Sequence, residues 1–258
     1  VFERLSRYRV RYYSDRLRKL NQASLHISGS RALLAQTLCF LPVCFGFLIP
    51  TSLLVYWTAF FAELQSLWAV TLNSFVLAGG SSVLIVAVAL MVAYANRLYP
   101  SKWLSHLTVL VGLGYALPGV VIAIGVLLPF SAIDHWISDR LQPFGVAPSL
   151  YLSGTIFALV FAYVVRFLAV ANGNVFSGLS RIRPSLDHSG RLLGLSQMGV
   201  LKSIHVPLMR GSVLTAILVC FVDILKELPA TIMLRPFNFD TLAVKAYALA
   251  GEERLIDA

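Results

Sequence analysis

Three charged side chains inside the apolar stretch 211–234 are the residues best placed to do chemistry. Asp223, Lys226 and Glu227 stand at positions i, i+3 and i+4, so on a helix they share one face. If the stretch crosses a bilayer, each charge at its centre costs about 3 kcal/mol, and this face must turn to the bundle interior or to water. Asp223 can pair with Lys226, which leaves one negative charge in excess. Because Pro229 breaks the helix just after Glu227, the pattern fits either a cation path or an ion pair that fixes helix packing.

The remaining chemistry-bearing residues form no recognisable catalytic or metal site. The sequence contains no Gly-x-x-x-x-Gly-Lys-Ser/Thr phosphate loop, so we expect ATP hydrolysis, if the protein depends on it, in a separate subunit. Cys39 and Cys44 would stand about 140° apart around a helix and suit a metal poorly, and Cys220 is isolated. The histidines are scattered without ligand spacing: His26, His106, His135, His188 and His205. We expect no catalytic residue, no metal site and no cofactor in this chain.

The elements that must position the charged stripe are membrane-spanning helices. Of the 258 residues 58% are hydrophobic and only 13% are charged, with a mean hydropathy of +0.78, which excludes an ordinary soluble enzyme and a disordered chain. Four long stretches without Asp, Glu, Lys or Arg do not alternate as the strands of a membrane barrel would. The sequence therefore predicts an all-α membrane protein with about five transmembrane helices, near 31–61, 68–94, 107–130, 149–170 and 211–234.

Details of the spans follow from single residues. We expect Pro118-Gly119 to kink the third helix, and 131–148 to form an outer loop. Arg166 falls near the end of the fourth span, where its side chain can extend to the cytoplasmic surface. Asp240 is expected to cap a short outer helix over 241–250, which could be a docking surface or a surface helix without that role.

The charges are distributed unevenly between the two sides of these spans. Segments 1–31, 95–106 and 175–210 carry fifteen basic residues, whereas the opposite side carries four. This asymmetry predicts that the N-terminus and 175–210 are cytoplasmic, and that 131–148 and 235–258 lie outside. The basic excess thus marks a membrane face in contact with lipid headgroups and does not indicate nucleic-acid binding.

The cytoplasmic loop 175–210 has the signals of two short helices. Pro184 suits a first turn, Asp187 favours the positive end of the helix dipole, Gly194 suits a stop with positive φ, and Ser196 can cap a second helix that runs to about His205. A helix–glycine–helix unit between two spans would protrude and could dock into another protein. A loop that packs on the membrane surface fits the same shape.

The sequence His188-Ser189-Gly190-Arg191-Leu192-Leu193-Gly194, followed by Ile204-His205-Val206-Pro207, resembles the coupling loop of binding-protein-dependent ABC importer permeases. That loop reads Glu-Ala-Ala, three residues, Gly, nine residues, Ile, any residue, Leu-Pro. Gly194, Ile204 and Pro207 stand at the matching positions. The chain departs from the pattern at 188–190, where Glu-Ala-Ala is usual, and at Val206, where Leu is usual.

Two further segments extend the resemblance to most of the chain. Residues 116–125, Ala-Leu-Pro-Gly-Val-Val-Ile-Ala-Ile-Gly, look like the third-helix segment of these permeases, and 223–231 with 234–243 look like their iron(III) branch. The resemblance implies a type I permease-like helical bundle over 32–258, in the second half of a fused double permease. Residues 1–31 would then be a basic cytoplasmic leader or linker, and a sixth helix would follow residue 258.

The resemblance also implies a function. The chain would be a multi-pass transport subunit, not an enzyme, of an ATP-driven importer in a bacterial inner membrane, with iron(III) as the expected cargo. Its partners would be an ABC ATPase that holds ATP and Mg, a periplasmic or extracellular substrate-binding protein, and a second permease half or copy. The coupling residues would be Asp187, His188, Ser189, Gly190, Gly194, Ile204 and Pro207, and the candidates for the translocation path Asp223, Lys226, Glu227, Pro229, Pro118 and Gly119.

Other cargoes fit the same fold, because polyamine, sulfate and thiamine permeases share it. A secondary transporter driven by an ion gradient through Asp223 and Glu227 is an alternative from another class. Co-purification of an ATPase would distinguish these classes.

Overall fold

The computed structural model describes residues 29–61, 67–99, 101–144, 147 and 149–254, and every regular element in these ranges is a helix. The described residues fall into two compact units. One contains Trp68–Lys245, and the other contains the helices before residue 67 and the end of the last helix, from Ala246. The two units are treated separately below. Most of the expected leader, residues 1–28, lies outside the described residues.

The N-terminal helices form the first predicted span. Helix α2 (Ser30–Val43), the π-helical turn η1 (Cys44–Leu48) and α3 (Ile49–Phe61) follow one another directly, and Ser30–Phe60 is apolar and long enough to cross a membrane. The π turn follows Pro42, which cannot donate a backbone hydrogen bond, and precedes Pro50. The span predicted over 31–61 is confirmed.

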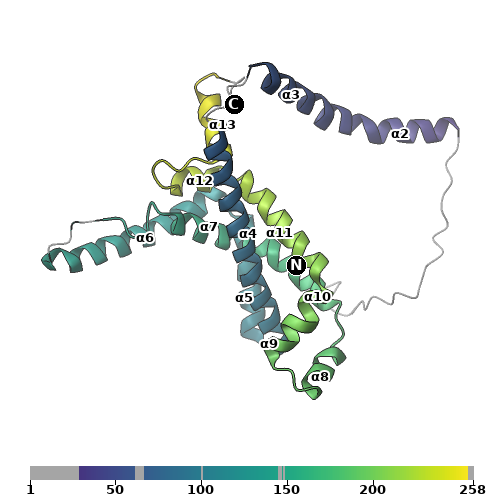
Figure 1. Ribbon diagram of the computed structural model, residues 1–258, viewed down its shortest axis with the longest axis vertical. Coiled ribbons are helices and arrows are strands. Elements are labelled where there is room, and N and C mark those ends of the chain that lie inside the picture. The colour runs from purple at the N-terminus through teal and green to yellow at the C-terminus, as the bar shows by residue number, and fades with distance from the viewer. Residues whose placement is uncertain (1–28, 62–66, 100, 145–146, 148, 255–258) are drawn as a thin grey trace. The chain divides into compact units, whose positions relative to one another are not determined.

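Helix α7 is the centre of the larger unit (Figure 1). It runs over Ile156–Ser180 and packs against α5, the 3₁₀ turn η3, α6, α11 and α12. Its buried face combines large residues, such as Tyr163 and Phe167, with fully buried alanines, which allow close helix approach. The long helix α4 (Leu67–Leu98) confirms the second span and buries one face that includes Ala78, Ser82 and Ile85.

The predicted third span, 107–130, is not one helix. Helix α5 (Lys102–Leu113) continues into η3 (Gly114–Ala116), and Leu117 is then extended, with φ −82° and ψ 140°. Leu117 precedes Pro118, and a residue before proline is driven out of the helical region. Pro118 therefore separates two helices where a kink was expected. The second, α6 (Gly119–Leu141), projects away from α4, α5 and α11 in Figure 1.

The outer loop predicted over 131–148 is wrong for most of its length, because α6 and the 3₁₀ turn η4 (Gln142–Phe144) carry the chain to Phe144. The predicted fourth span began too early and ended too early, since α7 starts at Ile156 and ends at Ser180. The late start has a specific cause. The buried Asp134 carboxylate of α6 accepts the backbone N–H groups of Tyr151, Leu152 and Ser153 at 3.1, 2.8 and 2.8 Å, so these residues are held in a turn.

The fifth span is broken, as Pro229 predicted. Helix α11 (Arg210–Leu225) and α12 (Pro229–Leu234) are separated by three residues, and α13 (Leu242–Gly251) follows near the predicted outer helix. The expectation that Asp240 caps α13 is wrong. Thr241 Oγ1 accepts the N–H of Val244 at 3.5 Å instead, because the Asp240 carboxylate pairs with Arg235.

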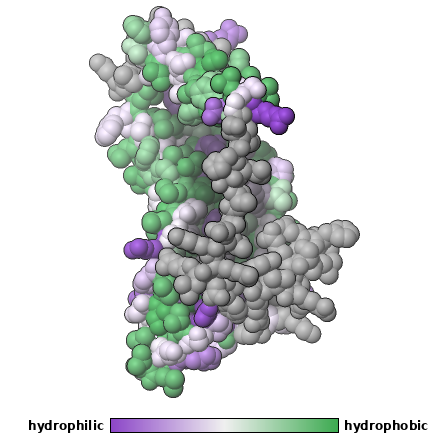
Figure 2. Space-filling model, turned by 90° about the vertical axis from the view of Figure 1, so that its right-hand side faces the viewer, coloured by the Kyte–Doolittle hydropathy of each residue, from purple (hydrophilic) through white to green (hydrophobic). Residues whose placement is uncertain are grey.

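The surface of the larger unit suits a lipid or protein environment. In Figure 2, which draws both units together, apolar side chains cover most of the coloured surface and hydrophilic residues form smaller patches. Large apolar residues such as Val76, Leu128 and Leu218 are more than half exposed. Four described helices are long and apolar enough to span a membrane, or five if α9–α10 and the sharply bent α11 are counted as one span.

The packing of η3 against α7 can be tested at Gly114, because this residue lies against the backbone of α7. A Cβ at Gly114 would meet the carbonyl oxygen of Val165 at 2.1 Å, whereas a Cβ at Gly112, two residues earlier, would meet nothing within 4 Å. We expect Gly114→Ala to destabilise the protein by roughly 2 kcal/mol and Gly112→Ala to be neutral or slightly stabilising. Thermal unfolding of the detergent-solubilised protein measures both, and equal melting temperatures for the two variants would contradict the packing described here.

Candidate functional site

Two breaks in the helical chain meet at one place in the larger unit. One is the extended Leu117 between η3 and α6, and the other is the gap between α11 and α12. Arg166, from the middle of α7, connects them. Its Nη1 donates to the Leu117 carbonyl at 2.9 Å, and its Nε lies 3.2 Å from Glu227 Oε2. One guanidinium thus binds a carbonyl released by the first break and a carboxylate at the second.

Glu227 is buried, with 7% of its side chain exposed. Its Oε1 accepts the backbone N–H of Ala230 at 3.3 Å, at the start of α12, where helical N–H groups have no partner within the helix. Gly119 leaves the room that this carboxylate occupies, since a Cβ there would lie 2.5 Å from Glu227 Oε1 and 3.2 Å from Pro229 Cβ. Four of the six path candidates, Pro118, Gly119, Glu227 and Pro229, are therefore brought together.

Arg166 is the residue of this cluster that sequence analysis misplaced. Its guanidinium does not extend to the cytoplasmic surface but pairs with Glu227, because a buried carboxylate needs a cation or a proton. Glu227 does not pair with Lys226. The sequence did carry a signal for this pairing: the charged stripe left one acid without a partner, and the fourth span held one isolated arginine.

The other two path candidates form their own pair, as predicted. Lys226 Nζ lies 2.8 Å from Asp223 Oδ1. The two side chains differ in exposure, with 10% for Asp223 and 70% for Lys226. The break therefore carries two ion pairs, one buried and one with its ammonium on the surface.

The predicted coupling loop is a compact unit of short helices. Helix α7 extends to Ser180, so the loop begins at residue 181 and not at 175. It contains α8 (Ser185–Leu192), α9 (Gln197–Val200), the π turn η5 (Leu201–His205) and α10 (Val206–Leu208). The predicted turn is confirmed, because Gly194 has φ +84° and Ser196 Oγ accepts the N–H of Gly199 at 3.1 Å.

Asp187 fixes this loop to the ends of two spans. Arg97 of α4 donates to both of its carboxylate oxygens, at 2.7 and 3.1 Å, and also to the carbonyls of Leu179 and Ile182 at the end of α7. His205 Nε2 lies 2.7 Å from Asp187 Oδ1. Burial alone would raise the pKa of Asp187, but the hydrogen bonds from Arg97 and His205 outweigh it, so the pKa lies below its ordinary value.

Close packing joins the two halves of the loop. A Cβ at the buried Gly190 would meet Ile204 Cδ1 at 2.9 Å and Val200 Cγ2 at 3.0 Å, so α8 approaches η5 through this glycine. His188, Ser189 and Pro207 are exposed, and so are Leu192 and Leu193, at 88% and 83%. The loop therefore has a buried polar clamp inside and an apolar tip outside.

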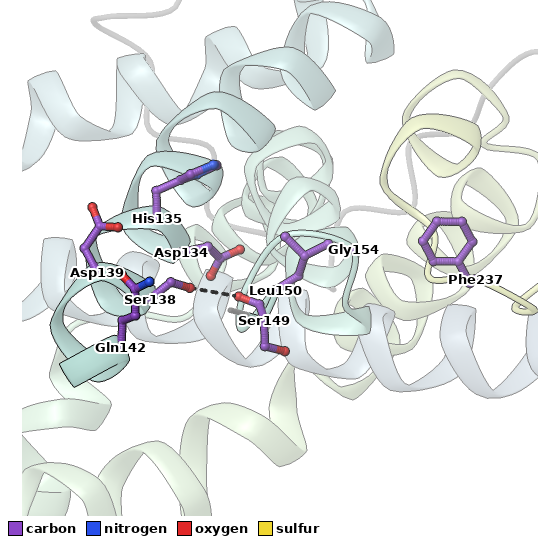
Figure 3. A pocket seen from close by; sticks show the side chains of 9 residues that line it. All are labelled: Asp134, His135, Ser138, Asp139, Gln142, Ser149, Leu150, Gly154 and Phe237. Atoms are coloured by element: carbon purple, nitrogen blue, oxygen red, sulfur yellow. Dashed lines mark hydrogen bonds between the residues drawn. The ribbon is translucent and has the colours of Figure 1, made fainter. Parts of the chain in front are cut away.

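A pocket of about 770 Å³ lies at the far end of α6, and sequence analysis did not anticipate it. Figure 3 shows the side chains that line it and the hydrogen bond from Ser138 to the carbonyl of Ser149. The lining residues are Asp134, His135, Ser138, Asp139, Gln142, Ser149, Leu150, Gly154 and Phe237. The Asp134 carboxylate is already satisfied by the 151–153 turn, so its role is to shape the pocket. Within the described ranges no three His, Cys, Asp or Glu residues are grouped to hold a metal ion.

The sequence of the chain is similar to those of transport permeases, although no family model matches it. The Fe(3+)-transport system permease protein FbpB 2 of Haemophilus influenzae is 27% identical over 87% of this chain and 45% of its own length. A putative 2-aminoethylphosphonate transport system permease protein, PhnV, of Salmonella paratyphi A is 25% identical over 74% of this chain and 66% of its own. The ferric transport system permease protein FbpB of Actinobacillus pleuropneumoniae is 26% identical over 70% and 24%. The chain thus spans less than half the length of the iron(III) permeases it matches.

The fold has a solved counterpart. A chain of a bacterial alginate ABC transporter, crystallised with an alginate pentasaccharide-bound periplasmic protein, superposes with a TM-score of 0.64, covering 88% of this chain and 84% of its own at 16% identity. The predicted fold class, an all-α bundle of the ABC importer permease type, is confirmed. The predicted resemblance to ABC importer permeases that include the iron(III) branch is confirmed as well.

The burial of the Arg166–Glu227 ion pair predicts how substitutions of its members change the free energy of unfolding. Removing one partner leaves the other charge buried and unpaired, so we expect Arg166→Met and Glu227→Gln each to destabilise the protein by about 3 kcal/mol. The double variant should recover at least half of the summed loss, because it buries no charge. Lys226→Arg, which keeps a cation beside Asp223 at the same break, is the matched control and should change stability little. Thermal unfolding in detergent measures all four, and strictly additive losses would count against the pairing.

Proposed function

We propose that this chain is a membrane-spanning subunit of an ATP-driven importer for iron(III) in a bacterial inner membrane. The observation that carries the proposal is the clamped helix–glycine–helix loop, combined with the broken fifth span to which it leads. The iron(III) permeases among the relatives support the cargo. The chain itself performs transport, and ATP and Mg are held by a partner ATPase.

The contacts of the loop allow a conformational change of the ATPase to be transmitted to several spans. The tip formed by His188, Leu192 and Leu193 is exposed and suits an apolar socket in the partner. Behind the tip, the Asp187 carboxylate binds Arg97 of α4 and His205 of η5, and η5 leads through α10 into α11. Displacement of the tip would therefore move α4, the end of α7 and α11 together.

In this proposal the movement of the loop reaches the broken fifth span through α11. Helix α11 ends next to the Arg166–Glu227 pair, which holds the starts of both α6 and α12. A shift of α11 changes the geometry of this junction, and with it the position of the charged side chains at 223–227. Glu227 serves in this scheme as the structural anchor of the junction, with Pro118, Gly119 and Pro229 shaping it.

Cargo would be delivered from the opposite side by a substrate-binding protein. The alginate transporter with the same fold was crystallised with a periplasmic protein, which supports such a partner. The outer end, with the pocket near Asp139 and the helix α13, is where we place its docking surface. The length of the Haemophilus relative, of which this chain covers 45%, supports a second permease half as a further partner.

A phosphonate is the second candidate cargo, because the Salmonella relatives are named for 2-aminoethylphosphonate transport. Polyamine, sulfate and thiamine find no support among the relatives reported above. An ion-coupled secondary transporter stays as the outcome that would replace the proposal if no ATPase co-purifies.

The coupling test changes Gly194. At φ +84° any β-branched residue is strained, so Gly194→Val should distort the tip and abolish the stimulation of ATP hydrolysis by iron-loaded binding protein in the reconstituted complex. Gly194→Asn, which tolerates this conformation, should retain most of the stimulation. Gly211→Val is the control, because Gly211 has no positive φ and a Cβ there meets nothing within 4 Å. Normal stimulation with Gly194→Val would remove the loop from the coupling path.

The orientation is tested by cysteine labelling in intact cells and in inverted vesicles. We expect Ser203→Cys to react only from the cytoplasmic side and Gln142→Cys only from outside, because of the basic excess on the loop side. Gln142 suits the label because it is exposed, in the turn that follows α6. Cys39 and Cys44 are changed to Ser in both variants, while the buried Cys220 stays. Labelling of both positions from one side would refute the proposed topology.

A further inference from the structure

The charged side chains at the break between α11 and α12 differ in how far they are exposed. The carboxylates of Glu227 and Asp223 are withdrawn, with 7% and 10% of their side chains exposed, and both accept contacts from cations. The Arg166 guanidinium that neutralises Glu227 is also largely covered, at 17%. The Lys226 ammonium is 70% exposed. The two carboxylates, the guanidinium and the ammonium together carry no net charge. The group among them that is exposed is the positive ammonium of Lys226.

This exposed ammonium stands in a segment that cannot face hydrocarbon. Lys226 directly follows α11, inside the stretch 211–234 that reads as a membrane span, and is the first of the three residues between α11 and α12. A charged group at this depth has to face water or protein, and non-helical backbone is tolerated there only beside a cavity or inside protein. Tyr115 of η3, two residues before the Leu117 carbonyl that Arg166 binds, is half-exposed.

We infer that Lys226 lines the translocation path and selects for negative charge, so that the cargo crosses as an anion or as iron(III) held by anionic oxygen ligands, and not as a bare trivalent cation. This inference rests on the proposed function and specifies the cargo of the same path. Glu227 is then not a cation ligand but the anchor behind the path.

Two physical reasons favour this reading of the break over a cation path. A bare trivalent ion would meet the exposed ammonium first and be repelled, most strongly where water is scarce. To bind the carboxylates it would also have to displace Arg166 from Glu227 or Lys226 from Asp223. An anionic oxygen needs neither rearrangement. Lysine is a common partner for phosphate, phosphonate and carboxylate oxygens, to which it offers three donors. A phosphonate, the cargo named for the Salmonella relatives, carries such oxygens itself.

The first experiment measures the sign of the local potential without any cargo. Tyr115→Cys and, separately, Leu117→Cys, both at exposed positions near the break, are made in a background with Cys39→Ser and Cys44→Ser. In native membranes the labelling rates of anionic and cationic methanethiosulfonates are compared, with and without Lys226→Met. We expect Lys226→Met to lower the anionic-to-cationic rate ratio about fivefold at both positions. An unchanged ratio, or no labelling by either water-soluble reagent, would overturn the inference.

The second experiment measures uptake by the reconstituted complex with ⁵⁵Fe supplied as its phosphate or citrate complex, and with labelled 2-aminoethylphosphonate. For whichever probe the wild type carries, Lys226→Met should reduce uptake roughly tenfold and Lys226→Arg should retain most of it. Asp223→Asn, which frees the ammonium, should leave uptake equal or higher. A cation path predicts the reverse order, with Asp223→Asn defective and Lys226→Met unimpaired, and that result would overturn the inference.

Failure of this inference and failure of the proposed function give different results. If the wild-type complex shows no ATP hydrolysis stimulated by binding protein and no uptake, the proposed function fails. If wild-type transport is normal and only the order of the variants is reversed, the importer stands and the path selects cations. The melting temperature of each variant, compared with that of the wild type, separates either result from misfolding.

Discussion

The structure of the larger unit depends on one buried ion pair at the point where two helices break. Arg166 and Glu227 lie on different spans, and each also satisfies a backbone group that a proline has left without a partner: the Leu117 carbonyl before Pro118 and the Ala230 N–H after Pro229. In a membrane such backbone groups cannot turn to solvent. The ion pair therefore allows two non-helical segments to exist at this depth, and Gly119 supplies the space for it.

The same design recurs at the coupling loop with different residues. Asp187 is a partly exposed acid held by an arginine from another helix, and Arg97 also binds the carbonyls at the end of α7. In both places an arginine with several donors joins a carboxylate to free carbonyls, which a lysine could not do with the same geometry. One clamp fixes the loop to the ends of the spans and the other fixes the broken span, and α11 lies between them. Helix α11 thus connects the loop directly to the break.

The packing of the loop explains two departures of this sequence from the permease pattern, at residues 188 and 190. Gly190 stands where the pattern has its second alanine, and here even a Cβ would press on Ile204 and Val200, so the loop packs more closely than an alanine would allow. His188 replaces the glutamate of the pattern and is exposed, while the acid that pairs within this loop is the preceding residue, Asp187. The carboxylate has thus a partner inside the loop, and the tip presents leucines and a histidine.

The sequence by itself determined the membrane class, most of the spans, the break at Pro229, the turn at Gly194 and the Asp223–Lys226 pair, because these depend on local hydrophobicity, on backbone restrictions of proline and glycine, and on spacing along one helix. It misjudged the third span, since Pro118 was expected to bend a helix that it in fact divides. It could not place Arg166, the helical course of 131–144, or the partners of Asp187 and Asp134. The partners of Arg166, Asp187 and Asp134 are side-chain or backbone groups 17 to 90 residues away in sequence, and which distant groups meet is decided only when the helices pack.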